Sequence, residues 1–172
     1  CKERPADYLV MILNDIDKKL TENGIDTKIA FPIYHDLLWG PIKEKFHNPS
    51  RFIYEFAPIT RTYTHSYDEI DTGKNRSIPP YIKNKTTSPR DIETNIAFFE
   101  EWKHAGYDDS FVFDYHIMWD HLMDLGYHSS AQMIHRDMRA IKKLGFGGMV
   151  SCQLTRCAFP SNLPLQIMAD TL

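Results

Sequence analysis

The chain has 172 residues, 42% of them hydrophobic and 25% charged, with a formal net charge of −3. These values are typical of one globular domain spanning residues 1–172, and they argue against a nucleic-acid-binding protein, which usually carries a basic surface. No apolar stretch approaches the ~20 residues that span a bilayer, so we expect no membrane partner. The sequence begins at Cys1 without an initiator methionine or a leader, and the length falls short of the ~250 residues of a complete (β/α)₈ barrel. We therefore expect a fragment of a larger protein, and the sequence leaves its compartment undetermined.

The first third of the chain predicts one helix and two strands. Apolar residues recur at helical spacing in the first segment, and they are Leu9, Ile12, Leu13, Ile16 and Leu20. Gly24 is placed to end this helix. Residues 27–33 and 51–57 are short apolar runs that close near a proline, as strands that emerge into loops do. Between them, residues 40–47 are expected to form a short helix.

The remainder predicts further strands and helices in alternation. Residues 60–89, rich in Thr, Ser, Tyr, Asn and Pro, are typical of a long functional loop. A helix is expected with Ser88 as its N-cap, Pro89 at its first position and Asp91 in its first turn, and it is expected to stop at Gly106. A strand follows over 110–116. A second helix, capped by Ser129 or Ser130, is expected to stop at Gly145. Residues 148–154 form the last predicted strand, and a final helix begins near residue 162.

This order indicates an α/β fold with a parallel sheet and outer helices, because apolar strands that alternate with helices pair in parallel. Four strands with helices at both ends match the C-terminal half of a TIM (β/α)₈ barrel. The rival is an open doubly wound sheet, but no GxGxxG or P-loop glycine pattern follows any predicted strand. We therefore favour the half-barrel.

Three segments carry a resemblance to a known family. They are SFVFDYHIMWDHLMDLGYHSS (110–130), HRDMRAIKKLGFGGMVSCQLTRCAFPSNLP (135–164) and, upstream, RFIYEFAPITRTYTH (51–65). Together they resemble an uncharacterised family of bacterial glycoside-hydrolase-like barrel domains, related to the barrels of α-glucuronidases and β-N-acetylhexosaminidases. The resemblance implies a carbohydrate ligand and glycoside hydrolysis. In the hexosaminidase-like relatives the catalytic acids end the fourth strand, which would precede Cys1, so the resemblance leaves open whether this chain is itself catalytic.

Candidate binding residues follow the predicted strands, because the active face of such a barrel lies at the carboxyl ends of its strands. Flat aromatic rings and fixed polar groups are what a sugar site needs. The substrate-binding candidates are Tyr34, His35, Trp39, Arg61, His65, Tyr115, His116, Trp119, Gln153 and Arg156. Arg61 or Arg156 is suited to pair with a uronic-acid carboxylate. Equally, the aromatic residues could roof the barrel, and the histidines could be ordinary core or surface residues.

Asp114 is the catalytic candidate, because it lies in an apolar strand where burial would raise its pKa toward the range of an acid–base group. It could equally anchor a loop or pair with an arginine. Glu55, in the middle of FIYEFA, is interpreted as a buried, paired structural residue. Glycoside hydrolysis needs two carboxyl groups about 5–5.5 Å or about 6.5–9.5 Å apart, which a sequence does not display.

Two other functions stay open. A metal-dependent hydrolase barrel could use the ligand types present at the strand ends, which are His35, Asp36, His65, His116, Asp120 and His121. The His-x-His pattern of such enzymes is missing from this sequence, as is any Cys/His zinc pattern, so we expect no metal and no cofactor. A non-catalytic carbohydrate-binding module would keep the aromatic residues alone. The inward positions of a half-barrel are apolar here, and they are Ile29, Phe31, Ile53, Val112 and Val150. We therefore expect its partner to be the rest of the parent barrel or a second copy of the chain.

Overall fold

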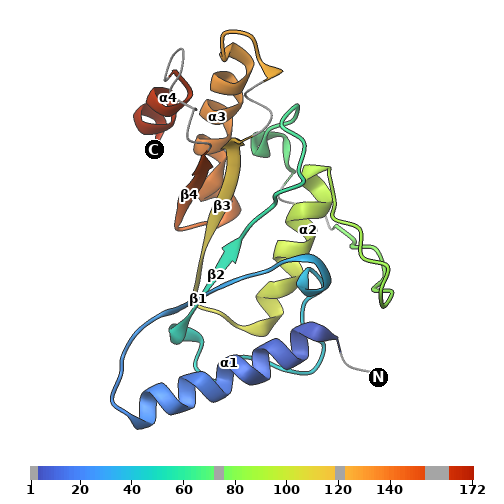
Figure 1. The fold of residues 1–172 in the computed structure, drawn as a ribbon, viewed down its shortest axis with the longest axis vertical. Helices are drawn as coiled ribbons and strands as arrows, with labels where there is room; N and C mark the ends of the chain where they lie inside the picture. Colours follow the sequence, from blue (N-terminus) through green and yellow to red (C-terminus); the bar gives the residue numbers. More distant parts are fainter. Residues whose placement is uncertain (1–3, 72–75, 119–122, 154–162) are drawn as a thin grey trace.

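The protein folds as a mixed α/β structure built on one parallel sheet. The computed structural model describes residues 4–71, 76–118, 123–153 and 163–172. The strands are β1 (Ile29–Pro32), β2 (Phe52–Phe56), β3 (Asp109–Ile117) and β4 (Gly148–Gln153), hydrogen-bonded in the order β1-β2-β3-β4 (Figure 1). All three strand pairs are parallel. The prediction of four adjacent parallel strands in sequence order is therefore confirmed.

Within the described ranges, four α-helices flank the sheet: α1 (Pro5–Glu22), α2 (Ile92–Trp102), α3 (His128–Ile141) and α4 (Leu163–Thr171). Figure 1 shows α3 and α4 side by side at the end of the molecule far from α1. The caps differ from the prediction: α2 is capped by Asp91, whose carboxylate accepts the Thr94 N–H at 2.7 Å, and α3 by Tyr127. No helix of the described chain is long and apolar enough to cross a membrane.

The expected helix over 40–47 is not formed, and short 3₁₀ helices lie on either side of it, at His35–Leu37 and Pro49–Arg51. The reason lies in α1. Asp7 Oδ1 accepts the backbone N–H groups of three consecutive residues, Ile42, Lys43 and Glu44, at 2.8–3.1 Å. These donors are thus satisfied by a carboxylate instead of by a helical turn.

The buried face of α1 is rotated from the predicted one. Ile12 and Ile16 remain 57% and 41% exposed, whereas the buried residues include Ala6, Val10 and Leu13 together with three polar ones. The polar residues bind the chain after β1: Asn14 Nδ2, for instance, donates to Lys45 O at 2.9 Å. Apolar spacing alone did not identify this face because α1 packs partly through polar side chains.

Burial alternates along the strands, so the two faces of the sheet differ. Phe52, Tyr54 and Phe56 of β2 are buried against the helices in an aromatic core that includes Phe99 and Trp102. The intervening residues are only half-buried. We call this second face the open face, and its members are Ile53, Glu55, Phe111, Phe113 and Val150.

The expectation of five inward-facing apolar residues holds only in part. Phe31 and Val112, expected on that inward side, belong instead to the helix-covered core, and Ile29 is half-buried and packed against it. Val150 is 45% exposed. The sheet thus has one face that is buried against the helices and a second face that is only partly covered by the described residues.

Candidate functional site

The carboxyl end of β3 is the chemically richest part of the described structure, and a β-bulge shapes it. In the pairing of β3 with β4, Asp114 lies opposite Ser151 but Ile117 lies opposite Gln153, so two residues, Tyr115 and His116, share one partner position. Bulges of this kind redirect side chains next to functional sites. Here Tyr115 contacts Phe113 and Tyr34, whereas His116 contacts the helix side of the sheet.

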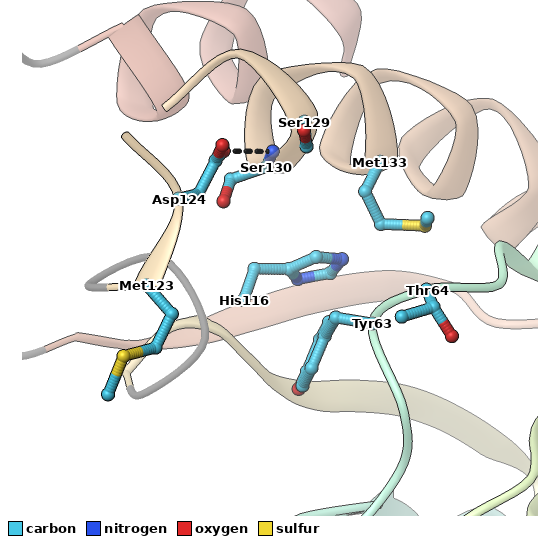
Figure 2. A pocket seen from close by; sticks show the side chains of 8 residues that line it. All are labelled: Tyr63, Thr64, His116, Met123, Asp124, Ser129, Ser130 and Met133. Carbon is cyan, nitrogen blue, oxygen red and sulfur yellow. Dashed lines mark hydrogen bonds between the residues drawn. The ribbon is translucent and has the colours of Figure 1, made fainter. Parts of the chain in front are cut away.

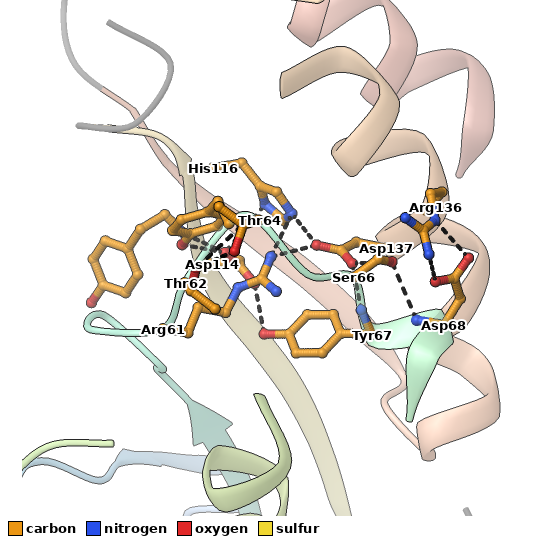
Figure 3. A network of polar contacts seen from close by, with 12 residues as sticks. Arg61, Thr62, Thr64, Ser66, Tyr67, Asp68, Asp114, His116, Arg136 and Asp137 are labelled. Carbon is orange, nitrogen blue, oxygen red and sulfur yellow. Dashed lines mark hydrogen bonds and ion pairs between the residues drawn. The ribbon is translucent and has the colours of Figure 1, made fainter. Parts of the chain in front are cut away.

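On the helix side, Arg61, Asp114, His116 and Asp137 form a buried ion network (Figure 3). The Arg61 guanidinium binds Asp137 Oδ2 through Nη2, and its Nε lies 3.3 Å from Asp114 Oδ2. His116 lies between the same two carboxylates, with Nε2 2.7 Å from Asp137 Oδ2 and Nδ1 3.2 Å from Asp114 Oδ1. One guanidinium and one imidazole therefore face two carboxylates, all almost fully shielded from water.

Neutral donors complete the network. Asp137 Oδ1 accepts the Ser66 hydroxyl and the Tyr67 N–H, both at 2.7 Å. Asp114 accepts the hydroxyls of Tyr63 and Tyr67 at 2.7 and 2.8 Å. The Arg61 guanidinium also stacks between those two tyrosine rings, at 4.3 and 4.1 Å from their centroids.

The two carboxyl groups therefore stay ionised. Burial alone would raise the pKa of Asp114, but the positive charges of Arg61 and His116 outweigh it and lower the pKa below its ordinary value. For Asp137 burial is likewise overcome, by the Arg61 charge and by the hydrogen bonds of His116 and Ser66, so its pKa is also lowered. This is opposite to the raised pKa that we expected for Asp114, and the reason is the arginine that the fold places beside it.

A pocket of about 250 Å³ lies over one edge of the network. Figure 2 shows His116 between Met133 and Tyr63. The opposite wall is the amino end of α3, where Asp124 Oδ2 accepts the Ser130 N–H at 2.7 Å. Because His116 is almost fully buried and engaged with Asp137, this pocket presents mainly the rings and thioethers around it, together with the serine hydroxyls.

On the other side of β3, Tyr34 and Tyr115 form a hydroxyl pair, with their oxygens 2.8 Å apart. The ion network holds this tyrosine pair in place, because the Tyr115 N–H lies 2.6 Å from Asp114 Oδ1 and 3.1 Å from the Tyr63 hydroxyl. Burial raises the pKa of Tyr115, and the hydrogen bond with Tyr34 raises it further. The Tyr115 hydroxyl therefore stays protonated. Phenol hydroxyls both donate and accept hydrogen bonds, so the pair can offer both to a ligand.

Glu55 lies on the same open face, below the tyrosine pair along β2. Its strand neighbours in register are Pro32 and Phe111, both uncharged. Burial raises the pKa of Glu55, and its carboxylate contributes in turn to the raised pKa of Tyr115. The sequence had been interpreted as giving a paired, structural Glu55, yet no described residue forms a hydrogen bond or ion pair with it.

The other predicted residues are scattered around this end of the sheet. The side chains of Arg61 and Asp114 have no exposed area, so the expected contact of Arg61 with a uronic-acid carboxylate is not available in this arrangement. Trp39 is buried and donates to Pro79 O at 2.7 Å, which fits the alternative role of a roof. His35, His65 and Gln153 are exposed, and His65 lies against Glu69. Trp119 and Arg156 lie outside the described residues.

Asp137 is the functional residue that the sequence analysis missed, although a signal was present. It lies in α3 with Ile134, Met138 and Ile141 on the buried side of the helix. An aspartate within such an apolar stripe needs a buried partner, because an unpaired buried charge is costly. The partner, Arg61, is 76 residues away in sequence.

Within the described ranges, no three His, Cys, Asp or Glu side chains are grouped so that they could hold a metal ion. Asp120 and His121, which belong to the metal-site alternative, lie outside those ranges. Comparison of the chain with protein-family models, curated proteins and solved structures finds no match. The geometry of the site is therefore what carries the functional argument.

Proposed function

We propose that the carboxyl end of this sheet binds a carbohydrate, and that the chain forms half of a glycoside-hydrolase-like (β/α)₈ barrel. The observation that carries the proposal is the hydrogen-bonded pair of Tyr34 and Tyr115, which lies with Phe113 on the face that the helices leave open. Barrel enzymes build their sites at this end of parallel strands, on the side that faces the barrel axis. The partner that completes the open face would be the rest of the parent barrel or a second copy of the chain.

A sugar suits the groups that this site presents. Sugar hydroxyls donate and accept hydrogen bonds at once, as do the two tyrosine hydroxyls. The half-buried rings of Phe113 and Tyr34 offer apolar surface to the C–H groups of a pyranose, whereas Tyr115 is only 6% exposed and holds the Tyr34 hydroxyl in place. The buried ion network supports the site from behind by fixing the backbone of Tyr115.

For hydrolysis we assign no role to Asp114, because its pKa is lowered and its side chain is enclosed by Arg61 and two tyrosines. Glu55 is the carboxyl that the described strands present beside the tyrosine pair. Hydrolysis requires a second carboxyl group. A carbohydrate-binding module without catalysis is therefore the second candidate, and the two are separated by testing whether bound oligosaccharides are cleaved.

The proposal is tested by titrating the full chain with short oligosaccharides of neutral, acidic and amino sugars. Calorimetry and NMR measure the binding. We expect binding to at least one class, and we expect the double variant Tyr34→Phe/Tyr115→Phe to weaken it by ~10-fold or more, since two hydroxyl contacts are lost at ~0.5–1.5 kcal/mol each. The protein should stay folded, because the rings remain.

The matched control is Tyr107→Phe. Tyr107 also packs in the aromatic core, but its hydroxyl is buried without a hydrogen-bond partner, so its loss should alter neither sugar binding nor folding. If the control and the double variant weaken binding equally, or if no sugar class binds, the site assignment is wrong.

A further inference from the structure

The inference concerns the charge of the sugar, and it rests on the proposed function. It begins with the position of Glu55 in β2. The neighbours Tyr54 and Phe56 are buried against the helices, so Glu55, between them, belongs to the open face. None of the residues of the four described strands is a lysine or an arginine. The open face therefore carries a carboxylate without a strand cation to balance it.

The fully buried carboxylates of the described chain each have donors. Half-buried Asp36 and Glu44 share with Glu55 the lack of a described side-chain partner, and what sets Glu55 apart from them is its place on the open face of the sheet. Asp17 binds the Arg51 guanidinium at 2.6 Å, and Asp114 and Asp137 share Arg61. Half-buried Glu55 has no hydrogen bond or ion pair among the described residues. Removing a carboxylate from water without giving it a partner is energetically unfavourable. This position is therefore suited to bind a cation that belongs to a ligand.

The surroundings of Glu55 fit a cation attached to a sugar. Pro32 of β1 lies opposite Glu55 in register, and Tyr34 follows Pro32 by two residues, so a ligand held by the hydroxyls of Tyr34 and Tyr115 would lie near the Glu55 carboxylate. The half-buried rings of Phe113 and Tyr34 on the same side of the sheet offer aromatic surface that attracts an ammonium group. A carboxylate on the ligand would instead be repelled by Glu55, and Arg61 is not available to it because that side chain is enclosed on the far side of β3.

We propose that this site prefers an amino sugar whose amine is protonated, with Glu55 as the residue that pairs with the ammonium group, and that it excludes uronic acids. The preference follows from placement and charge: one carboxylate without a partner among the described residues, near two hydroxyls and two aromatic rings. It departs from the expectation that Arg61 pairs with a uronic-acid carboxylate; Arg156, the other arginine of that expectation, lies outside the described residues.

The test compares three oligosaccharide series of equal length with the full chain at pH 6 and low salt: glucosamine, N-acetylglucosamine and galacturonate. We expect the glucosamine series to bind at least 10-fold more tightly than its N-acetylated counterpart, and galacturonate to bind more weakly than both. Because the preference is electrostatic, it should shrink several-fold between 20 mM and 500 mM NaCl. These measurements use the unaltered protein, so they do not depend on the folding of a variant.

Glu55→Gln should abolish the preference, with glucosamine binding reduced at least 10-fold and N-acetylglucosamine binding changed by less than 2-fold. The matched control is Asp15→Asn, which removes one negative charge from an exposed position of α1 and should change neither. If the neutral or acidic series binds as tightly as glucosamine, or if Glu55→Gln keeps the preference, the charge inference fails while carbohydrate binding stands. If none of the three series binds, both proposals are overturned.

Discussion

Replacement of Arg61 by methionine is the sharpest test of the buried ion network. Arg61 balances two carboxylates at once, and its side chain, like those of Asp114 and Asp137, has no exposed area. Methionine keeps much of the apolar volume of the arginine stem but removes the charge. The variant therefore leaves Asp114 and Asp137 buried with only His116 and neutral donors around them.

The expected loss of folding free energy is about 3–5 kcal/mol, the cost of removing one partner of a buried ion pair. The remaining neutral hydrogen bonds reduce this loss of folding free energy. Asp137 still accepts hydrogen bonds from the Ser66 hydroxyl and the Tyr67 N–H, and Asp114 still accepts them from two tyrosine hydroxyls. The lost stacking of the guanidinium on Tyr63 and Tyr67 adds to it. Against a total stability of ~5–15 kcal/mol, this loss is large.

The assay is urea unfolding followed by the fluorescence of the buried tryptophans Trp39 and Trp102. With a slope of ~2 kcal/mol per M, the midpoint should fall by ~1.5–2.5 M. The matched control is Arg136→Met on α3, where Arg136 pairs with Asp68 and Glu69 but stays 42% exposed (Figure 3). Exposed pairs contribute ~1 kcal/mol or less, so its midpoint should change little.

The reasoning would be refuted if Arg61→Met lost no more stability than Arg136→Met. A second test uses pH. The loss of stability of Arg61→Met relative to the natural protein should be smaller near pH 3, because the carboxylates that have lost Arg61 can then be protonated. A deficit that is the same at pH 7 and pH 3 would point to lost packing, and the charge argument would be wrong.

Three further outcomes are expected. Asp114 and Asp137 have lowered pKa values in the folded protein, so their contribution to stability is complete above the unfolded value of ~3.9 and is lost as the pH falls below it. The urea midpoint of the natural protein should therefore decline steeply below about pH 4. Asp7→Ala should cost ~2–3 kcal/mol in thermal unfolding, because several buried or half-buried backbone N–H groups lose their acceptor, whereas Asp15→Ala on the same helix should cost under ~0.5 kcal/mol. Gly145→Ala should cost ~1–2 kcal/mol through backbone strain alone, since Gly145 has φ +89° and an added Cβ meets no atom within 4 Å; a larger loss would contradict that origin.

The order and direction of the strands could be predicted from the sequence. Short apolar segments that alternate with segments of helical periodicity predict parallel strands joined by helices, and the structure confirms this for all four strands. The stops at Gly106 and Gly145 were likewise predictable, since both residues adopt the left-handed conformation that ends a helix. These features depend on neighbouring residues, which a sequence displays directly.

Tertiary structure alone decided which of these residues meet. Asp114 looked like an acid with a raised pKa until the fold placed Arg61 beside it, and the sign of that shift depends on a contact between residues 53 positions apart. The bulge in β3 was equally invisible, because it exists only in the pairing of β3 with β4, where Tyr115 and His116 share one partner position. A periodic pattern specifies which segments are buried, but charge balance and side-chain direction at a strand end depend on distances between distant segments, and only the folded chain sets those distances.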